Sequence, residues 1–99
     1  MKIFISQPMH DKTDEQIKLE RESVKELMKT YYGDDVEIID SFFESAPHNA
    51  NPVWFLGKSL ELLSGADVAY FCADWENYRG CKIEHEVCIE YGIPVRHYQ

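Results

Sequence analysis

The chain has 99 residues, 44% of them hydrophobic and 13% aromatic, which predicts one folded domain with a single core over 1–99 and argues against disorder. Its formal net charge of −8 argues against binding to nucleic-acid polymers or anionic membranes, since an acidic surface repels phosphate, although a few local donors could still hold one small phosphorylated ligand. The three cysteines make no disulfide framework and there is no leader or membrane-spanning pattern, so we expect a cytoplasmic protein.

Short apolar runs alternate along the chain with longer segments in which apolar residues recur at helical spacing. A capping-box pattern, Thr13 with Gln16 three residues on, marks the start of the first helix, and Gly33 suits its end. The elements expected in chain order are a strand over 2–6, a helix over 13–33, a strand over 35–40, a long loop over 41–52, a helix over 53–66, a strand over 67–72, a helix over 82–91 and a strand over 93–98.

This alternation predicts an α/β fold, a small flavodoxin-like or Rossmann-like three-layer sandwich with helices on both faces of the sheet. Right-handed crossovers favour four parallel strands in the order 2-1-3-4. In such sheets ligands bind beyond the carboxyl ends of the strands, at the point where the strand order reverses. That edge brings together residues 6–10, 41–43 and 74–80, and we expect the chemistry there.

Glu84 is the most unusual side chain of the last predicted helix. At about 100° per residue it falls near the middle of an apolar stripe, whereas Glu86 falls on the opposite, solvated face. A carboxylate on a packing face is costly unless it lines a pocket, which favours a functional site. The alternative is an ordinary charge at a helix N-terminus, favoured by the helix dipole. The stripe consists of Ile83, Val87, Cys88 and Tyr91.

The remaining candidates lie at the same predicted edge, and each also has an ordinary structural explanation. Ser6, Gln7 and Met9 could bind a sugar or phosphate, or form only a turn that Pro8 ends. Trp75 could stack on a base or cap the core, and Arg79 could donate to a phosphate or pair with Glu76 at the surface. Asp74 and His10 are candidates for a general acid. His85 and Cys88 have no second ligand pair, so we expect no metal.

Two segments, KIFISQPM at 2–9 and WENYRGCKIEHE at 75–86, resemble a family of small uncharacterised proteins, many of them from phages and bacteria. That family is similar to the nucleoside 2-deoxyribosyltransferase superfamily. The resemblance implies that Glu84 is the nucleophile of a retaining N-glycosidic reaction and that Gly80 is the motif glycine, with no cofactor. This chain departs from the superfamily pattern where Phe4 replaces a tyrosine, Ser59 an aspartate and Gln7 a glycine.

The sequence therefore leads to two hypotheses. The first is an enzyme that cleaves or transfers the N-glycosidic bond of a nucleoside or nucleoside 5′-monophosphate. The second is a protein without catalytic activity that sequesters a nucleotide or an ADP-ribose-like signal, which the departures from the superfamily pattern favour. For either we expect a homodimer or higher homo-oligomer, because a small domain with a wide mouth gains from a second copy that closes it.

Overall fold

A computed structural model describes residues 1–42 and 50–98. Its elements in chain order are β1 (Lys2–Ser6), α1 (Asp14–Tyr32), β2 (Glu37–Ile38), α2 (Pro52–Leu63), β3 (Val68–Phe71), the short 3-10 helix η1 (Trp75–Asn77), α3 (Arg79–Tyr91) and β4 (Val95–His97). The four strands form a parallel sheet in the order β2-β1-β3-β4, which confirms the predicted fold class and strand order.

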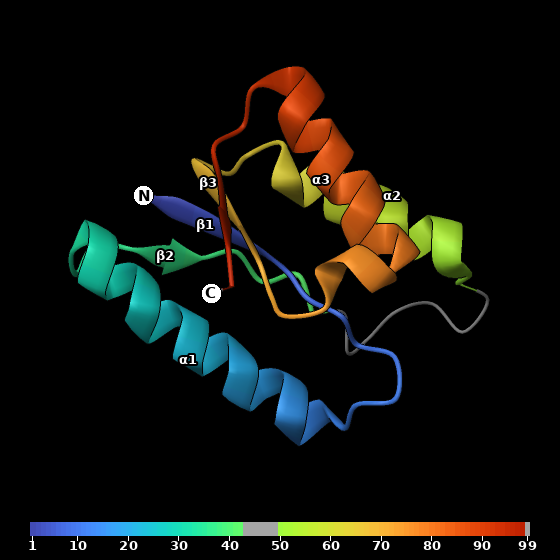
Figure 1. Ribbon diagram of the computed structural model, residues 1–99, viewed down its shortest axis with the longest axis horizontal. Coiled ribbons are helices and arrows are strands. Elements are labelled where there is room, and N and C mark those ends of the chain that lie inside the picture. The colour runs from blue at the N-terminus through green and yellow to red at the C-terminus, as the bar shows by residue number, and fades with distance from the viewer. Residues whose placement is uncertain (43–49, 99) are drawn as a thin grey trace.

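The helices cover the two faces of the sheet unequally (Figure 1). α1 lies on one face, where Val24 and Met28 pack against Ile3, Ile5 and Tyr70. α2 and α3 lie on the other face, where Leu63 and Cys88 pack against residues of β1 and β3. Since side chains alternate along a strand, Ile3 and Ile5 of β1 face α1, and Phe4 and Ser6 face the other two helices.

The start of α1 follows from its local sequence. The Thr13 hydroxyl accepts a hydrogen bond from the Gln16 backbone N–H at 3.1 Å, and the Gln16 side chain accepts one from the Thr13 N–H at 2.9 Å. This is the predicted capping box, which satisfies two backbone donors at the helix terminus. Gly33 ends the helix with a φ of 97°, a left-handed value that favours glycine.

Several boundaries differ from the predicted ones. β2 pairs over only two residues, against six predicted, and α3 begins at Arg79, three residues before the predicted start. Arg79 and Gly80 therefore lie in the first turn of α3 and do not precede it. Residues 43–49 of the predicted loop over 41–52 lie outside the described residues.

The buried face of α3 also differs from the predicted stripe. Its buried residues are Cys81, Glu84 and Cys88, while Ile83 is 42% exposed and Tyr91 is 80% exposed. The helix is therefore rotated relative to the predicted phase, and Glu84 is buried in either phase. Among the described residues, no helix is both long enough and apolar enough to cross a membrane.

Candidate active site

Glu84 and Ser6 meet at the carboxyl edge of the sheet. Ser6 is the last residue of β1, and Glu84 lies in the second turn of the helix that follows β3, so both lie beside the reversal of strand order between β1 and β3. The Ser6 hydroxyl donates a hydrogen bond to Glu84 Oε1 at 2.6 Å. Both residues are buried, and only 7% of Glu84 is exposed.

Burial decides the ionisation of this carboxyl group. It raises the pKa of Glu84 from 4.5 to about 7, although the hydroxyls of Ser6 and Ser59 favour the charged form and act in the opposite direction. Burial is the larger effect because Glu84 lies in the second turn of α3 and is almost completely shielded from solvent. A carboxyl group with this pKa is partly protonated near neutral pH, and the ionised fraction, which is the form that a nucleophile needs, grows as the pH rises.

Ser59 is a site residue that the sequence did not place among the candidates. It lies on α2, and its hydroxyl acts on the Glu84 carboxyl group together with that of Ser6. The resemblance placed Ser59 where the superfamily has an aspartate, and this match could have identified Ser59 as a candidate site residue. Phe4 lies on the same face of β1 as Ser6 but is 1% exposed in the core, and it offers no hydroxyl to the site.

Two thiols flank the carboxyl group on α3. Burial raises the pKa of Cys81 to about 11, with a lowering contribution from a hydrogen bond to Ser6 and a raising one from the charge of Glu84. Burial and the charge of Glu84 likewise raise the pKa of Cys88 to about 11. Both side chains are therefore neutral thiols at physiological pH, and they behave as small apolar neighbours of Glu84.

Gln7 faces away from Glu84. Its side-chain amide donates to the Ile17 carbonyl at 3.0 Å and to Glu20 at 2.8 Å, and its oxygen accepts from Arg21 at 3.3 Å. Arg21 also donates to the Ile39 carbonyl and the Ser41 hydroxyl. Gln7 is thus part of a network that joins the end of β1 to α1 and to the chain after β2.

Met9, His10 and Asp74 lie at the predicted edge of the sheet, but no contact between them and Glu84 is found in the described part of the chain. The Met9 carbonyl accepts from the Lys12 N–H in a turn. The His10 side chain is 81% exposed and lies 3.4 Å from Asp11. Asp74 is exposed, with a left-handed φ of 69°, at the start of η1. A substrate would have to bridge from Glu84 to any of the three.

Trp75 stacks on histidine rings of its own chain. Its ring centroid lies 4.2 Å from that of His85 and 5.5 Å from that of His97, with interplanar angles of 20° and 22°. The Nε2 atoms of the two histidines are 2.9 Å apart, which joins α3 to β4. One face of Trp75 is therefore already occupied. Across residues 1–42 and 50–98, no three His, Cys, Asp or Glu side chains gather as a metal site.

Arg79 and Gly80 begin α3 at the same edge. Arg79 is exposed, so its guanidinium group is accessible to a ligand. A Cβ atom added at Gly80 would meet nothing within 4 Å, so the space around this position does not itself require glycine.

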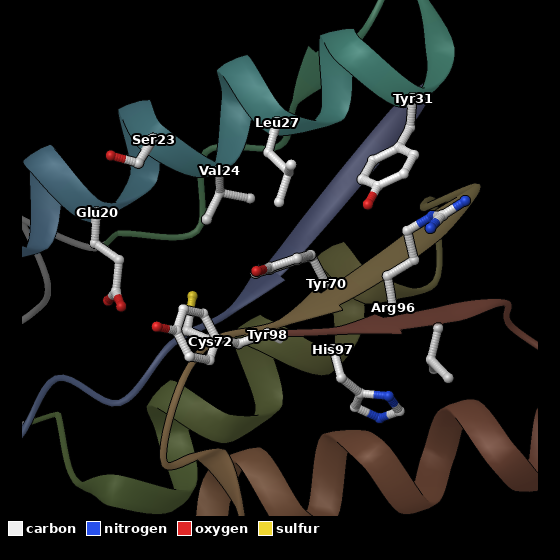
Figure 2. A pocket seen from close by; sticks show the side chains of 11 residues that line it. Glu20, Ser23, Val24, Leu27, Tyr31, Tyr70, Cys72, Arg96, His97 and Tyr98 are labelled. Carbon is white, nitrogen blue, oxygen red and sulfur yellow. The ribbon is translucent and has the colours of Figure 1, made fainter.

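Two hollows open near this edge, and Glu84 lines neither. One lies over the carboxyl end of β3 and is bordered by Asp74, Trp75, Glu76, His97 and Tyr98. The other, of about 540 Å³, lies on the α1 face of the sheet (Figure 2). Glu84 is on the opposite face, between β1, α2 and α3, and only a small part of it reaches solvent.

Comparison with known proteins gives a fold relationship. No protein-family model matches the chain, and no curated protein matches it in sequence. It is similar in structure to a crystal structure described as a conserved protein from Enterococcus faecalis V583, with a TM-score of 0.66 and 18% sequence identity. The match covers 97% of this chain and 61% of the Enterococcus chain. At this identity the similarity supports the parallel α/β fold alone.

Proposed function

We propose that this protein cleaves or transfers the N-glycosidic bond of a nucleoside or nucleoside 5′-monophosphate, with Glu84 as the nucleophile. The main support is the buried Glu84 carboxyl group, which accepts a hydrogen bond from Ser6 at the reversal of strand order. The motif resemblance places the superfamily nucleophile on the same residue. Asp74 and Arg79 at the same edge are the proposed general acid and phosphate donor.

The proposed reaction has two steps. A carboxylate oxygen of Glu84 attacks the anomeric carbon, the C–N bond breaks, and the base leaves with the bonding electrons and takes a proton from the general acid. Water or a second base then attacks the same carbon, the attacking group passes a proton to the residue that acted as the general acid, and Glu84 is released as a carboxylate. Ser6 and Ser59 favour the ionised form of Glu84 and hold it in one orientation during attack.

Sequestration without catalysis is the second candidate function. Two observations favour it: Phe4 supplies no hydroxyl to orient the nucleophile, and the raised pKa of Glu84 leaves it partly protonated at neutral pH. A protein of this kind would bind a nucleotide or an ADP-ribose-like signal at the same edge of the sheet and release it unchanged.

A paired substitution tests the enzyme proposal. Release of free base would be followed chromatographically for a panel of ribo- and deoxyribonucleosides and their 5′-monophosphates. We expect Glu84→Gln to abolish release, by about 10³-fold or more for loss of a nucleophile. Glu86→Gln, the control on the exposed side of the same helix, should retain activity. Equal losses in both variants would contradict the assignment, and intact recovery of every compound from the unmodified protein would leave sequestration as the better account.

A further inference from the structure

The cavity on the α1 face of the sheet is separate from the Glu84 site. It lies between α1 and the β3–β4 half of the sheet, and its volume of about 540 Å³ is within the usual range for small-molecule sites, about 300–1,000 Å³. Tyr70 and Arg96 point into it from the sheet, while Val24, Leu27 and Tyr31 point into it from α1 (Figure 2). It thus combines an apolar wall with aromatic rings.

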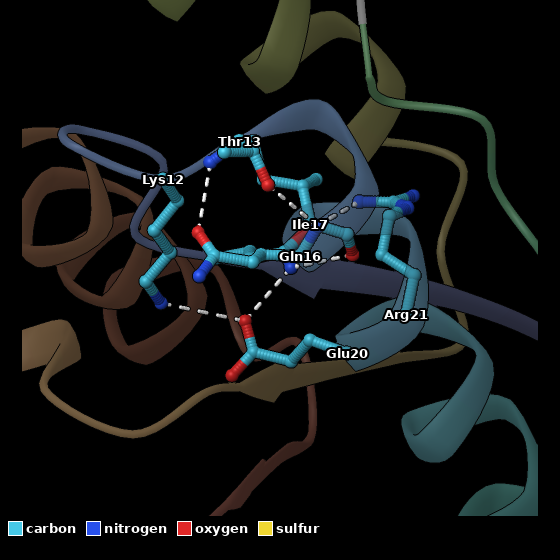
Figure 3. Close-up of polar contacts among 7 residues, drawn as sticks. Lys12, Thr13, Gln16, Ile17, Glu20 and Arg21 are labelled. Atoms are coloured by element: carbon cyan, nitrogen blue, oxygen red, sulfur yellow. Dashed lines mark hydrogen bonds and ion pairs between the residues drawn. The ribbon is translucent and has the colours of Figure 1, made fainter.

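One end of this cavity carries a negative charge. Glu20 lines it, with 29% of its side chain exposed, and its carboxylate points toward Cys72 and Tyr98 (Figure 2). Oε1 accepts a hydrogen bond from Gln7 and lies 3.6 Å from Lys12 Nζ, whereas Oε2 has no partner among the described residues (Figure 3). Half of this partly buried carboxylate is therefore free to interact with a cation.

Two tyrosine rings border the same end, and Tyr70 is the more buried of them, with 4% of it exposed. Burial, and then the charges of neighbours that include Cys72 and Glu20, raise the pKa of Tyr70, so its ring stays neutral and electron-rich. Tyr98 is 62% exposed beside it. The faces of neutral tyrosine rings attract cations, and an adjacent carboxylate adds to that attraction.

The other end of the cavity already holds a cation on tyrosine rings. The Arg96 guanidinium lies 4.1 Å from the ring centroid of Tyr31 and 5.1 Å from that of Tyr32, and it donates to the Tyr32 hydroxyl at 2.6 Å. No such cation covers Tyr70 and Tyr98 among the described residues. Both ends have tyrosine rings, but only at the Arg96 end does a cation of the chain lie over them, since Lys12 at the other end pairs with Glu20 Oε1.

We propose that this cavity binds a small organic ammonium ion, with its charged head between Glu20, Tyr70 and Tyr98 and its alkyl part against Val24 and Leu27. The net charge of −8 raises the local concentration of such cations. A phosphorylated ligand is disfavoured at the Glu20 end, because the carboxylate of Glu20 would repel its negative charge. The site is independent of the Glu84 reaction and lies on the other face of the sheet.

The test uses two cations and a neutral isostere of one of them. Choline, n-butylammonium and 3,3-dimethyl-1-butanol, which is choline with carbon in place of nitrogen, are titrated into the protein by calorimetry and by backbone amide chemical shifts. We expect at least one cation to bind, to shift amides around Glu20, Tyr70 and Tyr98, and to bind about tenfold or more tightly than the neutral isostere.

Variants then separate the cavity from the rest of the acidic surface. Glu20→Gln and Tyr98→Leu should each weaken cation binding by about fivefold or more, while Glu22→Gln, an exposed glutamate on the same helix, should have no effect. Thermal unfolding of each variant checks that it is folded. Failure of both cations to bind, equal binding of charged and neutral probes, or binding that Glu20→Gln and Tyr98→Leu leave unchanged would each overturn the proposal.

Discussion

Glu84 is a carboxyl group that the fold keeps out of water at a cost. The hydroxyls of Ser6 and Ser59 lower the pKa of Glu84, but they cancel only part of the increase that burial causes, and the pKa remains about 7. In the unfolded chain the same group would titrate near 4.5. Between these values the folded state binds the proton more tightly than the unfolded state, so the stability that this proton contributes is complete below about pH 4.5 and is lost as the pH rises through about 7.

Removing this charge should therefore stabilise the fold at alkaline pH. Glutamine can still accept the hydrogen bond from Ser6 but cannot ionise, so Glu84→Gln should raise the free energy of unfolding at pH 8.5 by up to about 3 kcal/mol and change it little at pH 4.5. Urea unfolding at the two pH values measures the difference. Glu86→Gln, on the exposed side of α3, should show no such dependence. A Glu84→Gln effect of the same size at both pH values would contradict the raised pKa.

The second prediction concerns Ser59, since its hydroxyl lowers the pKa of Glu84. If the ionised carboxylate is the nucleophile, kcat/KM should rise with pH through about 7 in the unmodified protein. Ser59→Ala removes one of the groups that favour ionisation, so this limb of the pH profile should move to higher pH with the plateau largely kept. Ser64→Ala, an exposed serine just beyond α2, is the control. A limb that stays in place in Ser59→Ala would show that Ser59 does not act on the carboxylate.

At the residue scale, the sequence predicted where candidate residues lie in the fold better than it predicted which partners their side chains contact. The helical pattern placed Glu84 on a packing face, and it is buried. It did not predict Gln7 in the α1 network or Trp75 against two histidines. Those contacts join residues of different segments, and the bond between Ser6 and Glu84 joins residues 78 apart along the chain. Local patterns carry no information about which distant partner a side chain meets.

At the scale of the elements, Arg21 joins three segments of the chain. From α1 it donates to Gln7 after β1, to the Ile39 carbonyl after β2 and to the hydroxyl of Ser41. Burial lowers the pKa of its guanidinium group, and the charge of Asp40 acts in the opposite direction. This cation holds the ends of β1 and β2 together at the edge of the sheet that carries the candidate site.

Loss of Arg21 should accordingly destabilise the fold more than loss of a comparable cation elsewhere. Arg21→Met leaves three partly buried acceptors without this donor and should lower the free energy of unfolding by roughly 2–4 kcal/mol. Lys25→Met, one turn further along α1, should change it by less than about 0.5 kcal/mol. Urea unfolding at neutral pH compares the two. Similar small effects in both variants would mean that Arg21 contributes little to holding this edge together.

Element boundaries were harder to predict than element types, for identifiable reasons. The residue before α3, Tyr78, makes no side-chain cap, so no sequence signal marks a start at Arg79. The run 35–40 has the apolar content of a six-residue strand, but only Glu37 and Ile38 pair with β1. The capping box of α1 is local, and so is the N-cap of α2, where the Trp54 N–H donates a hydrogen bond to the Asn51 side chain. The sequence analysis identified only the first of the two.

At the scale of the whole molecule, the strand order follows from chain geometry. Short apolar strands separated by helices require crossovers, and right-handed crossovers leave few orders for four parallel strands. This explains why the order β2-β1-β3-β4 could be predicted. The similarity to the Enterococcus faecalis structure extends over almost all of this chain but over 61% of that one, so the shared part is the α/β core.

The same topology brings the end of β1 and the start of α3 together, and the proposed chemistry depends on that juxtaposition. If Glu84 is the nucleophile, part of the substrate must become covalently attached to it during each turnover. A nucleotide with fluorine at the 2′ position slows the oxocarbenium-like breakdown of that intermediate and can trap it.

The most direct measurement is the intact mass of the protein after incubation with 2′-fluoro-2′-deoxynucleoside 5′-monophosphates. We expect an added mass equal to the fluorinated sugar phosphate, which appears with release of the base and is absent from Glu84→Gln but present in Glu86→Gln. An unchanged mass, with the analogues bound and recovered intact after denaturation, would contradict a glutamate nucleophile and support sequestration.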